Sequence, residues 1–409
     1  MPPVIVPHTP EVVRRNFRID LFSAICSGLY VAVVVGFMPV IVRRMGGTPT
    51  DVALVVAGPF IGHLLSPIGI YLLSGLPPVR VVAGVITTAR VVFLMGVLVA
   101  TTPLMLAMTT VTFWIIGVSN VAAYTTVMAA IYPDSERAQA MGKVRVGASV
   151  SAVAAAAVAG VLFDTTSATI VFAAATLLSL PGIVAFFWIR DEGRVEPPSR
   201  RPFTRVALEI WNDRRYRRLL EANTVYGLGN LMNGTIIALM LVDHFGAPNS
   251  FVGIMTALTA ATSVLAYIVW GRLIDRGSSL RLSAHNAALL VALPLTYLLA
   301  PDLWWLLPVA VVQGVVNSGF EITFHTNIVQ AAPRGRVLDY ATAQSFILGI
   351  RGTVAPFLAS ALLVVLAPRG VLMVIVTLML LGVVMYYRAV RAFEAPRPLV
   401  VEPAAPLEA

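Results

Sequence analysis

Four polar side chains recur at every fourth position inside one of the long apolar stretches of the chain. The segment QGVVNSGFEITFH places Gln313, Asn317, Glu321 and His325 four residues apart. Each step of four turns an α-helix by about 40° beyond one full turn, so these side chains form one slowly winding stripe. The stripe contains a carboxyl group that can exchange a proton and amides that can bind a polar solute. The alternative is hydrogen bonding between packed helices, worth roughly 0.6 kcal/mol per contact.

Arg351 lies near the middle of another apolar stretch, SFILGIRGTVAPF, with Gln344 seven residues earlier on the same face. An ionisable group within an apolar span costs about 2.5–3.5 kcal/mol, so it is a functional candidate. The depth of Glu321 and the length of the arginine stem predict an ion pair between Glu321 and Arg351. In this pair the glutamate would be the proton-exchanging member. A permanent structural pair is the alternative.

Arg90 lies in the middle of a third apolar stretch, within TTARVVF, and the sequence places no acid at its depth in the first half of the chain. An unpaired buried cation needs a counter-anion, backbone carbonyls or a substrate, and the sequence leaves these alternatives open. Four other polar residues are weaker candidates for lining a pore, and helix packing would explain them equally well: Asn120, Tyr124, Asn230 and Asn233.

The sequence contains no pattern typical of an enzyme or of a cofactor site. It has one cysteine, Cys26, with no thiol–histidine pair, no metal-spaced cluster of histidines and cysteines, and no phosphate-binding loop. The protein is therefore predicted not to be an enzyme, and we expect no cofactor and no metal.

The elements that hold these residues are predicted to be membrane-spanning helices. Of the 409 residues, 58% are hydrophobic and 12% are charged, and the mean hydropathy is +0.85. Soluble domains carry about 25% charged residues. Apolar runs of about 20 residues, enough to cross the hydrocarbon core as a helix, recur along the chain. Charges, prolines and glycines divide the sequence into twelve predicted spans, at residues 19–42, 52–74, 80–101, 103–131, 142–163, 168–189, 218–243, 250–272, 281–300, 303–329, 338–366 and 370–389.

The basic residues predict the orientation of these spans. With the N-terminus in the cytoplasm, 24 of the 29 basic residues fall on the cytoplasmic side and three on the outer side, while Arg90 and Arg351 lie inside spans. Cytoplasmic loops carry the excess of positive charge, so we expect both termini in the cytoplasm and a multi-pass protein of the cell inner (plasma) membrane. The basic residues cluster at span ends, so the pI of about 10.1 does not indicate nucleic acid binding.

The longest polar stretch divides the spans into six and six. We predict a cytoplasmic N-terminal tail (1–17), an N-terminal six-helix half (18–189), a cytoplasmic linker (190–217), a C-terminal six-helix half (218–391) and a disordered cytoplasmic tail (392–409). The linker places Phe203, Val206, Ala207 and Ile210 on one helical face, which suits a short amphipathic helix on the inner membrane surface. An ordinary polar linker is the alternative.

A charged corner between the eighth and ninth predicted spans reads GRLIDRGSSLRL and starts at Gly271. An offset of 201 residues aligns it with the corner between the second and third spans, so that Asp275 matches Ser74. The same offset matches Asp20 with Glu221. The two halves of the sequence therefore form a weak repeat in parallel orientation.

The chain resembles the major facilitator superfamily over essentially its whole length. Gly271, Leu273, Asp275 and Arg276 match the family's corner motif, roughly G-x-L-a-D-r-x-G-r-r, although the later glycine is displaced to Gly277. The segment YPDSERAQAMGKVR is similar to the family's corner between the fourth and fifth spans. The resemblance implies an all-α integral membrane fold, with twelve transmembrane helices in two pseudo-symmetric six-helix bundles.

The same resemblance implies a gating role for the corner residues Gly271, Arg272, Asp275 and Arg276. In the family, the corner aspartate locks the inner gate by facing the start of a helix in the opposite half, where free N–H groups carry partial positive charge. Here Asp275 would face the start of the fifth span, near residues 141–146.

The function implied by the resemblance is secondary active transport of a small molecule across the membrane by alternating access. The intramembrane charges suggest coupling to protons, and we expect an anionic or amphiphilic substrate, a monomer in the lipid bilayer and no nucleic acid partner. The fifth span has no proline and the fourth no arginine, which argues against the family's drug–proton antiporters. The alternative is a membrane sensor or scaffold with the same fold that transports nothing.

Overall fold

The structure, a computed structural model, describes residues 9–73, 75–190, 203–332 and 337–394. The tail was predicted to be disordered over residues 392–409. Residues 392–394 instead belong to a helix, and residues 395–409 lie outside the described residues. Linker residues 191–202 and the side chains of Asp275, Arg276 and His325 also lie outside them. The described elements are helices. Twelve of their segments are long and apolar enough to cross a membrane, which confirms the predicted number of spans and an all-α, multi-pass fold.

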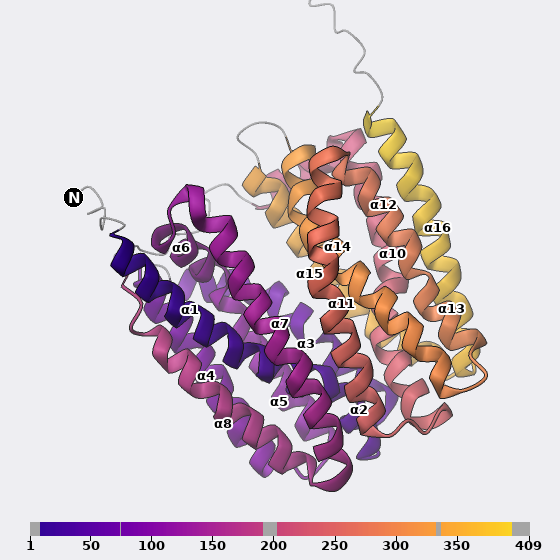
Figure 1. Cartoon of the computed structure of the whole chain (residues 1–409). Helices are drawn as coiled ribbons and strands as arrows, with labels where there is room; N and C mark the ends of the chain where they lie inside the picture. Colours follow the sequence, from indigo (N-terminus) through magenta and orange to yellow (C-terminus); the bar gives the residue numbers. More distant parts are fainter. Residues whose placement is uncertain (1–8, 74, 191–202, 333–336, 395–409) are drawn as a thin grey trace, which may run out of the picture.

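The N-terminal half holds the first six of these segments (Figure 1). Prolines open four of its helices, because proline fixes φ at a helical value and lacks only an N–H that would have no acceptor in the first turn. In chain order the elements are α1 (Pro10–Tyr30), η1 (Val31–Val35), α2 (Gly36–Arg44), α3 (Pro49–Leu72), α4 (Pro78–Val99), α5 (Pro103–Gly117), η2 (Val118–Asn120), α6 (Val121–Ile131), α7 (Asp134–Thr165) and α8 (Ala168–Phe186).

The C-terminal half follows a short helix, α9 (Phe203–Asn212), which lies where the linker was predicted to be helical. The position of α9 on the membrane surface stays a prediction. The remaining elements are α10 (Arg214–Leu239), η3 (Met240–His244), α11 (Asn249–Arg276), α12 (Ser279–Leu290), α13 (Ala292–Leu299), η4 (Leu303–Leu306), α14 (Leu307–Ala331), α15 (Val337–Leu362) and α16 (Pro368–Glu394).

Two helices begin well before the apolar limits that the sequence predicted. Helix α1 begins at Pro10 where residue 19 was expected, and α7 begins at Asp134 where residue 142 was expected. Arginines and other polar residues end an apolar run, but they do not end a helix, because backbone hydrogen bonding continues outside the hydrocarbon region. The helices therefore extend beyond the spans.

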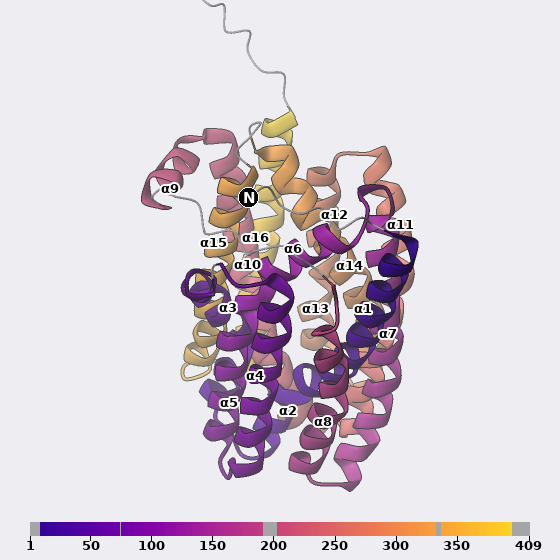
Figure 2. The same ribbon diagram turned by 90° about the vertical axis from the view of Figure 1, so that its left-hand side faces the viewer.

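The two halves meet along two pairs of helices. We call the face at which α1 begins and α16 ends the terminal face, and the other end of the bundle the opposite face. The halves diverge toward the terminal face and converge toward the opposite face (Figure 1), and Figure 2 views the N-terminal half from its outer side. Helix α7 packs along α11, and α3 packs along α15. These two contacts therefore define the interface across which the halves can move.

Two glycines bring α7 and α11 into backbone contact near the opposite face. A Cβ atom on Gly160 would lie 3.1 Å from the Cα atom of Gly253, and one on Gly253 would lie 3.0 Å from the Cα atom of Gly160. Any larger side chain at either position would push the helices apart. The absence of side chains here therefore allows the close approach of the halves.

Asp164, near the end of α7, caps the first turn of α11 in the other half. Its Oδ1 accepts the N–H of Asn249 at 2.8 Å, and its Oδ2 accepts the N–H of Ser250 at 2.8 Å. The first amides of a helix have no acceptor within the helix and carry partial positive charge, so a carboxylate binds there through charge-assisted hydrogen bonds. Asp164 with these two bonds, the helix-cap latch, joins the halves at the opposite face.

An ion pair reinforces the latch at the same face. The Nε atom of Arg43 lies 2.9 Å from each carboxylate oxygen of Asp243, and its Nη2 atom lies 2.8 Å from Oδ2. Arg44 donates to the carbonyl of Ala247. Both arginines of the α2 end, Arg43 and Arg44, therefore bind the other half. The opposite face is therefore closed.

Removal of the Asp164 carboxylate is expected to open the opposite face. A lost hydrogen bond to a charged group costs about 1.5–3 kcal/mol. We therefore expect the ratio of closed to open molecules to fall at least about tenfold in Asp164→Ala. Spin labels on Val99→Cys and Leu299→Cys, in a Cys26→Ala background, report this distance by double electron–electron resonance, because both positions are exposed at the opposite-face ends of α4 and α13.

Thr102→Ala is the matched control for this experiment. Thr102 caps α5 at the same face by accepting the N–H of Met105 at 3.2 Å, within a single half. Its removal should leave the distance distribution unchanged. A wild-type distribution in Asp164→Ala, or an equal broadening in Thr102→Ala, would show that the latch does not hold the halves together.

Candidate functional site

The carboxylate of Glu321 on α14 is bound by residues from both halves. Arg145 on α7, in the N-terminal half, forms an ion pair with it through Nη1 and Oε1. Tyr267 on α11, in the C-terminal half, donates its hydroxyl to Oε2. The side chains of Arg145 and Glu321 are 50% and 40% exposed. We call these three residues the interface triad.

The predicted ion pair between Glu321 and Arg351 is wrong. Arg351 instead donates from Nη1 to the backbone carbonyl of Asn223 on α10. The packing of the helices explains the difference, because α15 packs against α3 and α10, whereas α14 packs against α11 and α12. Sequence position gave the depth of both side chains in the membrane but not the direction in which each one points.

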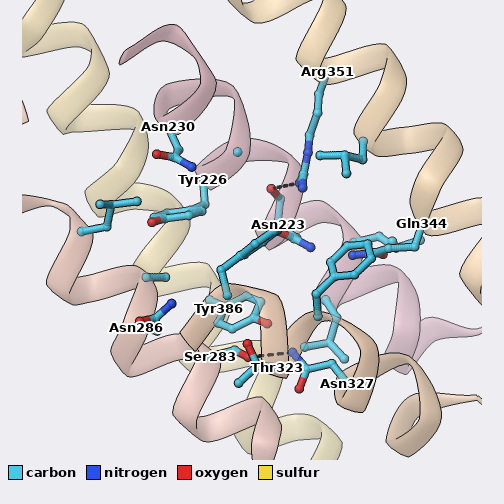
Figure 3. Close-up of a pocket in the computed structure, with 18 of the residues that line it drawn as sticks. Asn223, Tyr226, Asn230, Ser283, Asn286, Thr323, Asn327, Gln344, Arg351 and Tyr386 are labelled. Carbon is cyan, nitrogen blue, oxygen red and sulfur yellow. Dashed lines mark hydrogen bonds between the residues drawn. The ribbon is translucent and has the colours of Figure 1, made fainter. Parts of the chain in front are cut away.

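A cavity of about 220 Å³ lies inside the C-terminal half, between α10, α12, α14, α15 and α16 (Figure 3). The predicted residues Asn317, Asn230 and Arg351 line it. Among the described residues of the N-terminal half, Phe60 on α3 also lines the cavity. The other polar side chains of the lining are those of Tyr216, Asn223, Tyr226, Ser283, Asn286, Thr323, Asn327, Gln344 and Tyr386. This many hydrogen-bonding groups around one space can bind a polar solute.

The polar stripe of α14 serves two regions at once. Asn317 lines the cavity within the C-terminal half, whereas Glu321, one turn later, contacts α7 across the interface. The slow winding of the stripe accounts for this change of direction. Gln313 is half-buried, and the side chain of His325 lies outside the description.

Arg90 is buried within the N-terminal half, at 3% exposure. Its Nη1 donates to the carbonyl of Ser179 at 2.9 Å and its Nη2 to the hydroxyl of Ser27 at 3.0 Å. The guanidinium carbon lies 4.7 Å from the centre of the Tyr30 ring, which is a cation–π contact. The sequence left open whether Arg90 binds a counter-anion, backbone carbonyls or a substrate. Its contacts match bonding to the backbone and to neighbouring side chains.

The weaker candidates have different surroundings from one another. Asn120 donates to the carbonyl of Gly117 within its own chain segment. Asn233 is buried between α10 and α16, where its amide lies 3.7 Å from the sulfur of Met379. Tyr124 donates weakly to Asp20 at 3.4 Å. Packing accounts for these three, whereas Asn230 lines the cavity.

Sequence reasoning missed a buried acid in α1. Asp20 is 2% exposed, and its Oδ2 accepts the hydroxyl of Tyr132 at 2.9 Å. Its position near the start of the first predicted span suggested an ordinary charge at the membrane surface. The two tyrosines that bind it, Tyr132 and Tyr124, lie more than 100 residues away, so only the fold brings them together. The other missed residues are Arg145, Tyr267 and Asp164.

The corner of the predicted gate lies at the terminal-face end of α11. Gly271 has open space where a Cβ atom would lie, and Arg272 is exposed. The expected start of the fifth-span helix at residues 141–146 is wrong, because α7 begins at Asp134 and residues 141–146 are inside the helix. The contact of Asp275 with the start of this helix stays a prediction. The side chains of Asp275 and Arg276 are outside the description.

Comparison with known proteins identifies a family. The sequence matches the family model described as Major Facilitator Superfamily twice, over residues 21–227 and 219–407. Curated proteins give no match.

Among solved structures, the fold is similar to a variant of the nucleoside transporter NupG, with a TM-score of 0.71, 11% identity and coverage of 93% of this chain and 100% of that chain. It is also similar to a bacterial homolog of the human lysosomal transporter Spinster in an inward-facing and unoccupied conformation, with a TM-score of 0.66, 15% identity and coverage of 95% and 98%. At these identities the likeness concerns the fold.

Loss of the ion pair in the interface triad is expected to loosen the terminal face only slightly. Exposed ion pairs contribute about 0.2–1 kcal/mol, so Arg145→Ala should raise the fraction of molecules open at this face by up to about fivefold. Spin labels on Leu76→Cys and Leu273→Cys, exposed at the terminal-face ends of their segments, measure this change. The charge-reversed pair Arg145→Glu with Glu321→Arg should restore the wild-type distances.

Arg217→Ala provides the control for an ion pair within one half. Arg217 and Glu221 are 3.4 Å apart on α10 and are 35% and 44% exposed, close to the exposure of the triad pair. This variant should leave the label distances unchanged. Equal effects of the two single variants, or no rescue by the reversed pair, would rule out a contact that couples the halves.

Proposed function

The chain belongs to the Major Facilitator Superfamily and is a membrane transporter of a small molecule, and on this basis we propose that it works by secondary active transport coupled to protons. Alternating access requires two gates that open in turn around a solute site. The halves, their two helix-pair contacts and the cavity provide the parts. The solute that we propose is anionic or amphiphilic, and the transporter is proposed to act as a monomer.

The proposed location is the cytoplasmic membrane, with the terminal face in the cytoplasm. The distribution of basic residues in the sequence supports this orientation, since 24 of 29 are assigned to the predicted cytoplasmic side. The opposite face, closed by the helix-cap latch and the Arg43–Asp243 pair, would then be the outer face. The structure would accordingly represent a state that is closed to the outside.

The observation that carries the proposal of proton coupling is the interface triad. Wide opening of the terminal face moves α7 away from α14, and this movement separates Arg145 from Glu321. The charge that faces the Glu321 carboxylate therefore differs between the joined and the separated halves, and we propose that Glu321 exchanges its proton when the halves separate. A group whose proton affinity depends on conformation couples the conformational change to the proton gradient.

The low strength of the triad supports this role. An exposed ion pair contributes at most about 1 kcal/mol, so it biases the equilibrium between gate states without fixing it. The corner from Gly271 to Arg276 is proposed to complete the gate at the terminal face. With α7 beginning at Asp134, the first turn of α7 is the target that we now propose for Asp275.

Glu321→Gln is expected to abolish accumulation driven by a pH gradient and to preserve exchange, because exchange requires no net proton movement. The solute is first identified from a panel of radiolabelled hydroxy acids, sugar acids and N-acyl amino acids, by uptake into proteoliposomes with an inward proton gradient. Accumulation and counterflow are then measured with that solute. We expect at least a tenfold loss of accumulation and a counterflow rate within about twofold of wild type.

Glu221→Gln is the matched control, because Glu221 is an acid of the same half that is 44% exposed and pairs within α10. It should accumulate solute like wild type. Gradient-driven uptake by Glu321→Gln at the wild-type level would show that Glu321 is structural. Specific binding with no flux in wild type would favour the alternative, a membrane sensor or scaffold that does not transport.

A further inference from the structure

The guanidinium of Arg351 is a buried cation without a counter-charge among the described residues. Arg351 is 6% exposed, and its Nε atom is buried with no hydrogen-bond partner among the described residues. The ion pairs between described residues join other arginines to acids. The polar side chains beside it are the phenols of Tyr226 and Tyr386, which are neutral at pH 7. An isolated charge in an apolar bundle is strongly unfavourable unless an anion or hydrogen bonds compensate it.

The backbone of α10 holds this guanidinium in place. The Nη1 atom donates to the carbonyl of Asn223 (Figure 3). The guanidinium lies against the backbone of Gly227. A Cβ atom on Gly227 would lie 2.6 Å from Nη1, 2.8 Å from Cζ and 2.9 Å from Nε. Only a residue without a side chain leaves room for this position, so Gly227 is a positioning residue for Arg351.

The amides of the cavity fall into two groups. Three amides already have partners. Asn327 donates to Ser283 at 2.7 Å and accepts from Ser279 at 2.7 Å. Asn286 donates to the carbonyl of Val316 at 2.9 Å, and Gln344 accepts the hydroxyl of Tyr216 at 3.3 Å. The side-chain amides of Asn223, Asn230 and Asn317 make no hydrogen bond to another described residue, and all three line the cavity. The cavity therefore presents unused donors and acceptors beside an uncompensated cation.

From this arrangement we infer that the cavity binds a small organic monoanion, with its carboxylate against Arg351 and its hydroxyl or amide groups against Asn223, Asn230 and Asn317. The inference deepens the proposed transport function, because this anion would be the transported solute. One guanidinium and no carboxylate in the described lining match a single negative charge, whereas a phosphate dianion would need a second cation. A volume of about 220 Å³ lies below the ~300–1,000 Å³ of pockets for drug-sized ligands, so the solute is small.

Phe60 connects this site with the interface between the halves. It is the described residue of the N-terminal half that lines the cavity, and its ring packs on Gly352, the residue after Arg351 in α15. A Cβ atom on Gly352 would lie 2.1 Å from the Cγ atom of Phe60. Movement of α3 along α15 would therefore displace one wall of the solute site.

The test compares each carboxylate with its neutral amide. Purified full-length protein is titrated calorimetrically with gluconate, mandelate and N-acetylglycine, with the corresponding amides and with inorganic phosphate. We expect at least one carboxylate to bind at least tenfold more tightly than its amide. Arg351→Gln should weaken that binding at least tenfold, and Gly227→Ala should weaken it as well by displacing the guanidinium. Arg217→Gln, which removes an exposed arginine of α10, should bind like wild type.

The unfolding temperature of the Arg351→Gln variant shows whether Arg351 serves to bind a ligand or to stabilise the fold. Without ligand, Arg351→Gln should unfold at the wild-type temperature or above it, because the variant removes an uncompensated charge. Three results would overturn the inference: no carboxylate preferred over its amide, phosphate bound more tightly than every carboxylate, or Arg351→Gln with unchanged affinity and a lower unfolding temperature. Binding is measured without flux, so a protein that binds the anion and does not transport it would refute only the proposed function.

Discussion

The absence of water in the hydrocarbon core is the constraint on which the rest of the structure depends. Every charged side chain inside the bundle must find its partner in the protein. Arg90 finds a carbonyl, a hydroxyl and the ring of Tyr30, and Asp20 finds two tyrosine hydroxyls. Among the described residues, Arg351 finds one hydrogen-bond acceptor, the carbonyl of Asn223. Among the described residues, Arg90 and Asp20 therefore have more partners than Arg351, and this difference underlies the proposal that Arg351 binds a ligand.

The same constraint gives the two ends of the interface different strengths. At the opposite face, a carboxylate accepts two amides at a helix start and an arginine contacts both oxygens of an aspartate. Toward the terminal face, Arg145 and Glu321 are both about half exposed, and water competes with their attraction. A transporter must release both contacts in turn. The unequal strengths are consistent with a resting state that is closed at the opposite face and only weakly held at the other.

The membrane-spanning helices could be predicted from the sequence because the length of an apolar run determines whether it can cross the membrane. The twelve spans and the helix in the linker follow from apolar runs and their polar interruptions. Partners were harder to predict, because a sequence gives the depth of a side chain but not its direction around the helix. This is why Glu321 was paired with Arg351 although it binds Arg145. Asp164 resembled any acid at a span end, and only the fold places it at the start of α11.

The position of Arg351 on α15 suggests how binding and movement are linked. Arg351 and Gly352 are consecutive, so the solute site and the contact with Phe60 share one helical turn. A ligand shifts a conformational equilibrium only by its difference in affinity for the two states. With Phe60 in place, the cavity keeps one of its lining residues, and with α3 displaced it loses that residue. Under the inference drawn here, a bound anion would favour the arrangement of the halves in which α3 stays packed on α15, and its departure would remove that preference.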